Sequence, residues 1–205
     1  MLVLVPTELE ADPLRGLPLE IAVVGMGPVE AGLSALEVLR ERRPPVAFLT
    51  GLAGAYPGTD LAPGDLVLAT EEVFGDLALC FPEGVRPMGR HLPLSERISL
   101  RSPWLERTLA LLEEGGGGAR VGPLVTVCCA TRDPARALEL ARRHEALAEN
   151  MEGFAVAEAA RRTGVALVEL RIISNLLEAP EAPWEIERAL DRLREVFGWL
   201  SQHFA

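Results

Sequence analysis

The sequence predicts an α/β fold with a central mixed, largely parallel sheet flanked by helices, in a single domain that covers residues 1–205. Two observations predict it. Short apolar runs rich in Val, Ile and Leu alternate with segments of helical periodicity, an order typical of strands joined by crossover helices. A chain of 205 residues also suits one domain with a substantial core, and no internal repeat divides it.

The first half of the chain is expected to hold four strands and one helix. Each strand is a short apolar run that ends near Pro, Gly or a polar residue. A Gly-Pro pair opens the helix, two prolines close it, and the third strand is expected to end in a glycine-rich turn at Gly51–Gly54. The expected elements are the strands Leu2–Val5 and Glu20–Gly25, the helix Val29–Arg42, and the strands Val46–Leu49 and Asp65–Glu71.

The second half is expected to be richer in helix. Prolines in and next to residues 83–101 predict an irregular segment. Asp133 is a typical N-cap before Pro134, and Gly164 is a typical helix end. The expected helices are Trp104–Glu114, a segment that starts at Asp133, Met151–Thr163 and the amphipathic Pro183–Phe204, and the expected strands are Pro123–Cys129 and Val165–Ile173.

Charge and composition exclude several functions. The net charge of −10 argues against a nucleic-acid partner, because phosphate binding needs a basic surface. All 20 basic residues are Arg, which excludes Schiff-base chemistry on Lys and a P-loop. No apolar run is long enough to predict a membrane span, and the first residues lack the basic region of a signal peptide.

The cysteines predict a reducing compartment. Cys80, Cys128 and Cys129 are odd in number, and the adjacent pair lies inside an apolar run, so we expect buried, reduced thiols in a cytoplasmic protein. Their spacing does not match a zinc site, and we expect neither a metal nor an organic cofactor.

Polar residues follow several of the predicted strands. Because ligands of α/β sheets bind at the carboxyl ends of strands, these residues predict a site. A carboxylate there suits sugar hydroxyls and an amide suits a nucleobase. A Rossmann site is not expected at Gly25-Met26-Gly27, because Glu30 stands where the third glycine should be. The candidate segments are Thr7–Glu10, Gly51–Gly54, Glu71–Asp76, Thr131–Arg132 and Ser174–Asn175.

Two motifs carry a family resemblance. Met151-Glu152-Gly153, followed by Arg171-Ile-Ile-Ser-Asn, resembles the signature of the nucleoside phosphorylase/nucleosidase superfamily. The Gly51–Gly54 segment resembles its glycine-rich pattern, although Leu52 replaces a small polar residue. Phe154 stands where relatives usually have Ala. The resemblance covers most of the chain and implies a nucleoside phosphorylase-like fold, a small-molecule nucleoside substrate and a homo-oligomer, dimeric or larger.

The resemblance also implies roles for single residues. It places Glu10 where the base that activates water should lie, with Glu8 as the alternative if the register shifts. It assigns Glu152 to the ribose hydroxyls and Met151 to packing beneath the sugar and base. Arg171 is expected near the attacking water and a carboxylate, or equally in a structural ion pair. Further substrate contacts are expected from Ala53, Gly54, Thr131 and Ser174.

Asn175 indicates which base is bound. Adenine-specific nucleosidases of the superfamily carry Asp there, whereas Asn can donate to both N7 and O6 of a 6-oxopurine. Three carboxylates in the loop at residues 6–12 would repel phosphate, so water is the expected nucleophile. The resemblance therefore implies hydrolysis of an inosine-like nucleoside whose 5′ tail bears a benzoate, with release of hypoxanthine.

Three other interpretations stay open: a methylthioadenosine/S-adenosylhomocysteine nucleosidase, a purine nucleoside phosphorylase, and an inactive nucleoside-binding protein. The cationic anchor for the substrate tail is also open, and an interface between subunits is expected around Phe74–Pro93. The candidate anchors are Arg90, His91, Arg101 and Arg132.

Overall fold

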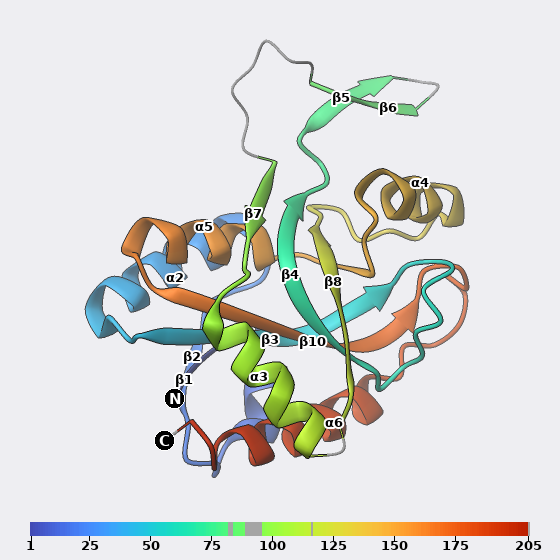
Figure 1. The fold of residues 1–205 in the computed structure, drawn as a ribbon. Coiled ribbons are helices and arrows are strands. Elements are labelled where there is room, and N and C mark those ends of the chain that lie inside the picture. The colour runs from blue at the N-terminus through green and yellow to red at the C-terminus, as the bar shows by residue number, and fades with distance from the viewer. Residues whose placement is uncertain (82–83, 89–95, 116, 205) are drawn as a thin grey trace.

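The computed structural model describes residues 1–81, 84–88, 96–115 and 117–204. Its centre is a mixed, twisted sheet with helices on both faces, which confirms the predicted fold class (Figure 1). The strands of this sheet are β1 (Leu2–Val5), β2 (Glu20–Val23), β3 (Val46–Ala55), β4 (Leu66–Phe74), β7 (Arg97–Ser99), β8 (Ala119–Thr126), β9 (Ala148–Asn150) and β10 (Ala166–Leu176).

The sheet closes on itself. β10 pairs with β4 on one side and with β3 on the other, and the order β10-β4-β8-β9-β3 returns to β10. The pairs β3–β10, β4–β8 and β8–β9 are parallel, whereas β4–β10 and β3–β9 are antiparallel. β1 and β2 extend the sheet from β3 in parallel. A closed ring leaves few strand edges unpaired and brings the ends of β3, β9 and β10 together.

Helices cover the sheet in two layers. α2 (Pro28–Arg42) and α5 (Gly153–Thr163) pack over one apolar cluster, whereas α3 (Pro103–Glu114) and α6 (Ile186–Leu200) pack over another (Figure 1). α4 (Pro134–His144) covers a third, beside β8. The remaining elements are α1 (Glu8–Ala11), a 3-10 turn at Asp12–Leu14 and the hairpin β5 (Ala78–Phe81) and β6 (Gly84–Pro87). No helix within the described ranges has the length and apolar character of a membrane span.

Three strands continue beyond their predicted ends, and β4 is one of them, since it continues to Phe74. β3 was expected to end in a glycine turn, but its pairing with β10 continues through Gly54 and Ala55, so the glycine segment is extended. β10 likewise continues to Leu176 and therefore contains Ser174 and Asn175. Backbone hydrogen bonding between β3 and β10 overrides the weak strand propensity of glycine here.

The cysteine prediction was wrong in one respect. β8 ends at Thr126, so the adjacent Cys128 and Cys129 lie in a bend beyond it, and both thiols are free but exposed. Apolar neighbours had suggested a buried strand, but the chain turns before reaching them. The side chain of Cys80 lies outside the described residues, as do the candidate anchors Arg90 and His91 and residues 82–83 and 89–93 of the expected interface.

Candidate active site

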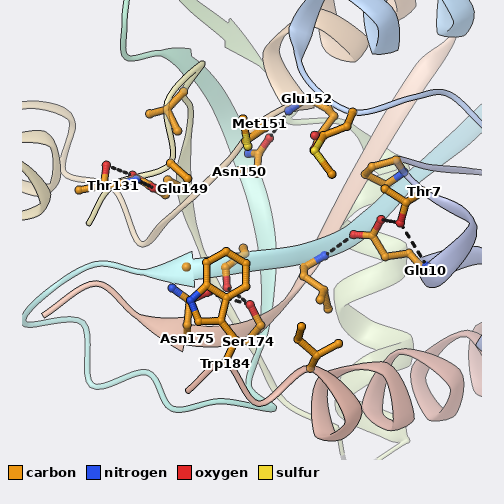
Figure 2. A pocket seen from close by; sticks show the side chains of 18 of the residues that line it. Thr7, Glu10, Thr131, Glu149, Asn150, Met151, Glu152, Ser174, Asn175 and Trp184 are labelled. Carbon is orange, nitrogen blue, oxygen red and sulfur yellow. Dashed lines mark hydrogen bonds between the residues drawn. The ribbon is translucent and has the colours of Figure 1, made fainter. Parts of the chain in front are cut away.

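A cavity of about 210 Å³ opens where the ends of β1, β3, β9 and β10 meet. Figure 2 shows Glu10 with Thr7 on one side of it and Thr131 with Glu149 on the other, while Met151, Glu152, Ser174 and Asn175 lie between them. Apolar walls come from Met26, Leu52, Val127, Leu177, Trp184 and Ile186. Nine residues were predicted to act in catalysis or substrate binding, and eight of them line this cavity, with Arg171 behind its wall. The eight are Glu10, Ala53, Gly54, Thr131, Met151, Glu152, Ser174 and Asn175. The candidate segment Glu71–Asp76 does not line it.

Glu10 is positioned by the short helix α1. Thr7 caps this helix, and its hydroxyl donates to Oε2 of Glu10 at 2.6 Å. The backbone N–H of Leu52 donates to Oε1 at 3.0 Å, so both oxygens of a carboxylate only 7% exposed are held in place. Glu8 lies on the opposite side of the helix, where its exposed carboxylate pairs with Arg15. The geometry therefore supports Glu10 over Glu8 as the candidate base.

Gly51 explains why Glu10 can lie so close to the sheet. A Cβ at this position would be 2.6 Å from Oε1 of Glu10 and 2.9 Å from Nη1 of Arg171. Only glycine leaves space for a carboxylate and a guanidinium beside the same backbone atom. The contribution of this glycine is therefore the space that it leaves for the side chains of Glu10 and Arg171.

Glu152 is the N-cap residue of α5, which begins one residue later, at Gly153. Its carboxylate is not used for capping. Oε1 accepts a hydrogen bond from the backbone N–H of Gly27 at 3.1 Å, and Oε2 accepts one from Arg171 at 3.3 Å. The Gly25–Gly27 turn thus contacts the predicted ribose carboxylate. Glu152 is 4% exposed but lines the cavity, so its carboxylate is accessible to hydroxyl donors of a bound ligand.

Arg171 is fully buried behind the cavity wall. Its guanidinium donates from Nε to Glu169 at 2.9 Å, from Nη1 to Glu152 at 3.3 Å and from Nη2 to the Asn150 side chain at 3.2 Å. Burial alone would lower the pKa of Arg171, but the charges of Glu169 and Glu152 raise it overall, so the side chain stays cationic. Arg171 therefore forms the predicted ion pair, and this pair includes a carboxylate of the cavity wall.

The end of β10 presents Ser174 and Asn175. A register shift between Ile173 and Asn175 interrupts the alternation of the strand. Strict alternation would place Arg171, Ile173 and Asn175 on one face of β10, but Ile173 joins the apolar core, while Ser174 and Asn175 both line the cavity. A bulge of this kind re-aims side chains.

Asn175 is oriented by its neighbour. The hydroxyl of Ser174 donates to Oδ1 of Asn175 at 2.8 Å. This contact assigns the carbonyl side of the amide and leaves its N–H donors for a ligand. Gly54 provides the space, because a Cβ there would be 3.1 Å from Nδ2. Asn175 is therefore presented to the cavity as a hydrogen-bond donor.

Thr131 and Glu149 form the wall across the cavity from Glu10 (Figure 2). The backbone N–H and the hydroxyl of Thr131 each donate to the Glu149 carboxylate at 2.7 Å, and the hydroxyl of Tyr56 donates to it at 3.2 Å. Burial raises the pKa of both Glu149 and Tyr56. Glu149 was missed because β9, the strand that carries it, is only three residues long and has no alternating pattern.

Other residues were also missed. Trp184 and Ile186 reach the cavity from the loop and helix after β10, and Met26 reaches it from the turn after β2. No sequence motif marks Trp184 or Ile186, and only the closing of the sheet brings them to the turn that carries Met26. Of the predicted tail anchors that are described, Arg132 is exposed next to Thr131, whereas Arg101 lies in a separate groove beside α5. Within the described ranges no group of His, Cys, Asp and Glu side chains suits a metal ion.

Gly153 offers a test of this packing. A Cβ there would lie 2.2 Å from Oε1 of Glu72 and 2.7 Å from Oε1 of Glu169, and both side chains are fully buried. Gly153→Ala is therefore expected to lower the free energy of unfolding by about 3 kcal/mol, measured by urea denaturation. The matched control is Gly118→Ala, where nothing lies within 4 Å of the added Cβ. It should change stability by less than about 0.5 kcal/mol. Equal effects of the two variants would contradict the crowding at Gly153.

Comparison with known proteins finds one family model and close sequence relatives. The phosphorylase superfamily model matches residues 13–200. The futalosine hydrolase of Thermus thermophilus is 38% identical and covers 94% of this chain and 91% of its own length. The futalosine hydrolase of Acidothermus cellulolyticus is 34% identical over 88% of this chain and 74% of its own length.

Solved structures share the fold. A structure of Helicobacter pylori futalosine hydrolase matches with a TM-score of 0.85, at 19% identity, over 98% of this chain and 97% of the other. A mutant of Helicobacter pylori MTAN, with 5′-methylthioadenosine in its active site, matches with the same score, identity and coverage. Structural likeness at this identity establishes the fold and leaves the activity to the site.

Proposed function

Because this chain belongs to the phosphorylase superfamily and to its futalosine hydrolase family, we propose that it hydrolyses the N-glycosidic bond of futalosine. The products are hypoxanthine and dehypoxanthine futalosine. Futalosine is an inosine with a benzoate-bearing 5′ tail, and the reaction belongs to menaquinone biosynthesis. The observation that carries the proposal is the convergence of Glu10, Glu152 and Asn175 in one cavity, from three segments far apart in the sequence.

Glu10 is the base in this mechanism. Its carboxylate, held by Thr7 and the Leu52 N–H, takes a proton from water as the water oxygen bonds to the anomeric carbon. The glycosidic C–N bond breaks, its electrons pass to the purine, and the purine anion takes a proton from solvent water to give hypoxanthine, while Glu10 returns its proton to solvent. Positive charge develops on the sugar ring during this step, so carboxylates near the ring are placed to stabilise it.

Glu152 and Asn175 act on the two sides of the breaking bond. Glu152 accepts hydrogen bonds from the ribose 2′- and 3′-hydroxyls, and Met151 packs beneath the sugar and base. Asn175 donates to N7 and O6 of the leaving hypoxanthine and so stabilises the charge that the base acquires. Ala53, Gly54, Thr131 and Ser174 complete the substrate contacts. Arg171 acts through Glu152, which it contacts directly.

Water is favoured over phosphate as the nucleophile. Among the described residues that line the cavity there is no Arg or His, so these residues provide no cation to bind phosphate. The carboxylate of Glu10, at the cavity end of β1, would repel it, whereas Glu8 and Asp12 pair with Arg15 outside the cavity. A cation that binds the benzoate tail must therefore lie outside the cavity lining. Arg132, which follows Thr131 on the cavity wall, is the candidate among the described residues.

Purine release measures the function directly. Futalosine, inosine and 5′-methylthioadenosine are each incubated with the protein, with and without phosphate, and the freed base is separated by chromatography. Hypoxanthine release from futalosine that does not depend on phosphate supports the proposal. Adenine release from methylthioadenosine alone would favour the adenosine nucleosidases, and dependence on phosphate would favour a phosphorylase.

Asn175→Asp tests the assignment of the base. The substitution removes the amide donor, so kcat/KM for hypoxanthine release should fall by roughly 10- to 100-fold, while adenine release from methylthioadenosine should rise. Asn175→Ala is the matched control, because it removes the donor and introduces no acid; it should lose hypoxanthine release with no gain for adenine. An unchanged purine preference in Asn175→Asp would contradict the role of Asn175.

The wider setting is part of the same proposal. Residues 1–205 form a single domain that works in the cytoplasm as a homo-oligomer. The hairpin β5–β6 supports the expected position of the interface, because it projects from the body of the molecule and exposes Leu79 and Phe81 (Figure 1).

A further inference from the structure

Two carboxyl groups lie side by side in the core and have no part in the mechanism described above. Glu72 on β4 and Glu169 on β10 are both 0% exposed. Oε1 of each lies beside the position that a Cβ on Gly153 would take, at 2.2 Å for Glu72 and 2.7 Å for Glu169, so the two groups meet at the start of α5. Burying two acids together is costly unless charge and hydrogen bonds compensate.

If every carboxyl group of this cluster were ionised, the negative charges would outnumber the positive charge beside them. Arg171 is the cation that the described structure places against this cluster, and it contacts Glu169 and Glu152. One guanidinium would thus face three carboxylates, those of Glu72, Glu169 and Glu152. Two neighbouring buried carboxyls in such a setting retain one proton between them. Burial, and then the charge of Glu169, raises the pKa of Glu72 well above its usual range.

The hydrogen bonds run from this pair to the cavity. Oε1 of Glu72 accepts from Nδ2 of Asn150 at 2.6 Å, and Oε2 accepts from the hydroxyl of Thr126 at 2.6 Å. The other end of the Asn150 amide, Oδ1, accepts from the backbone N–H groups of Glu152 at 2.9 Å and of Gly153 at 2.7 Å. Glu72 therefore fixes which way the Asn150 amide points, and the amide fixes the backbone at Glu152.

Glu169 acts on the Glu152 side chain by a second route. It accepts from Nε of Arg171 at 2.9 Å, and the same guanidinium donates to Oε2 of Glu152 and to Oδ1 of Asn150. Oε2 of Glu169 has no hydrogen-bond partner among the described residues, so a full negative charge on Glu169 is only partly satisfied. The two routes meet at Glu152, one through its backbone and one through its carboxylate.

From this arrangement we propose that Glu72 and Glu169 share one proton and act together as a positioning pair, which holds Asn150 and Arg171 in the orientation that aims Glu152 at the ribose. The inference rests on the proposed function for the role of Glu152. The shared proton is independent of that function. It leaves a single negative charge on the pair, and this charge balances Arg171 without drawing the guanidinium away from Glu152.

Two substitutions of Glu169 separate charge from shape. Glu169→Gln keeps an oxygen for Nε of Arg171 and leaves the pair with the single negative charge that the proposal gives it. Glu169→Leu keeps the approximate volume and removes the acceptor. Glu71→Gln is the matched control, because Glu71 is the neighbour of Glu72 on β4 but pairs with Arg97 near the surface.

The proposal predicts different kcat values for the two Glu169 variants. With the nucleoside that the parent protein hydrolyses, Glu169→Gln should stay within about threefold of the parent kcat, and Glu169→Leu should lose roughly tenfold or more. The loss should appear in kcat more than in KM, because Glu152 bonds the ribose most strongly in the transition state. Equal losses in the Gln and Leu variants, or full activity in the Leu variant, would overturn the proposal.

The pH dependence of folding stability provides a second test that needs no substrate. It compares the parent with Glu169→Gln, so it can be carried out even if Glu169→Leu does not fold. The pKa of both groups is raised above the usual 4.5 by burial, so the folded state binds more protons than the unfolded state. Stability is then fully present below pH 4.5 and is lost as pH rises toward the pKa of the folded pair. Other titratable groups near the pair are Arg171, Glu152, Glu10 and Tyr56.

Thermal unfolding should therefore differ between the variants. From pH 4.5 upward, the melting temperature of the parent should fall relative to that of Glu169→Gln, whereas Glu71→Gln should follow the parent. Parallel curves for the parent and Glu169→Gln would show that no proton is shared. If futalosine proves not to be the substrate, this comparison still decides the state of the pair.

Discussion

Glu10→Gln is expected to reduce kcat for hypoxanthine release by roughly 10³-fold, the largest loss of any single substitution in the cavity. The amide keeps the shape of the side chain, and it can still face the Thr7 hydroxyl and the Leu52 N–H. It cannot take a proton from water. Because substrate binding depends mainly on other residues, KM should change little, and single-turnover assays should place the loss in the chemical step.

Glu8→Gln is the control for this result. Glu8 is two residues away on the same short helix, but its side chain is 69% exposed and pairs with Arg15 at the surface. Its substitution should change kcat by less than about twofold, since exposed ion pairs contribute little. A large loss of kcat in Glu8→Gln, together with an active Glu10→Gln, would mean that Glu8 is the base instead of Glu10.

Glu152→Gln is expected to lower kcat/KM by roughly 10²- to 10³-fold. A carboxylate accepts from two ribose hydroxyls, and each bond to a charged group is worth about 1.5–3 kcal/mol. The neutral amide offers one acceptor oxygen, and it also leaves Arg171 without one of its two carboxylate partners. Steady-state kinetics with futalosine and with its 2′-deoxy analogue measure the loss.

The deoxy analogue makes the test specific. The parent enzyme should process it poorly, whereas Glu152→Gln should discriminate much less between the two substrates, because the discriminating contact is already gone. Glu158→Gln, on the exposed side of the same helix, is the control and should behave as the parent does. A variant at Glu152 that still strongly prefers the ribose substrate would contradict its assignment.

The sequence predicted the fold class and the superfamily well, for identifiable reasons. Apolar runs and helix caps such as Asp133 are local signals, and the structure contains every predicted helix and strand in the predicted order. It adds α1, β5 and β9, and it has β6 and β7 where an irregular segment was expected. The resemblance carried by Met151-Glu152-Gly153 and by the end of β10 is confirmed by the family model. The roles of Glu10, Glu152 and Asn175 stay predictions, although the structure brings all three side chains to one cavity.

What could not be predicted depends on contacts between distant segments. The extension of β3 and the bulge in β10 arise from their mutual pairing, and neither strand shows them alone. β9 exists only because β3 and β8 flank it, so Glu149 and Asn150 carried no visible pattern. Glu72 was part of the candidate segment Glu71–Asp76, but its burial against Glu169 follows only from the closing of the sheet.

Trp184 gives the cavity a built-in optical signal. It is 45% exposed on the cavity wall, whereas Trp104 of α3 and Trp199 of α6 pack against the apolar cluster beneath those helices and do not line the cavity. A purine that stacks against or shields the Trp184 indole alters its fluorescence, while the other two indoles supply a constant background. Occupancy of the site can therefore be followed without turnover, in Glu10→Gln as readily as in the active enzyme. Binding and chemistry, which purine release always reports together, become separable by emission from one side chain.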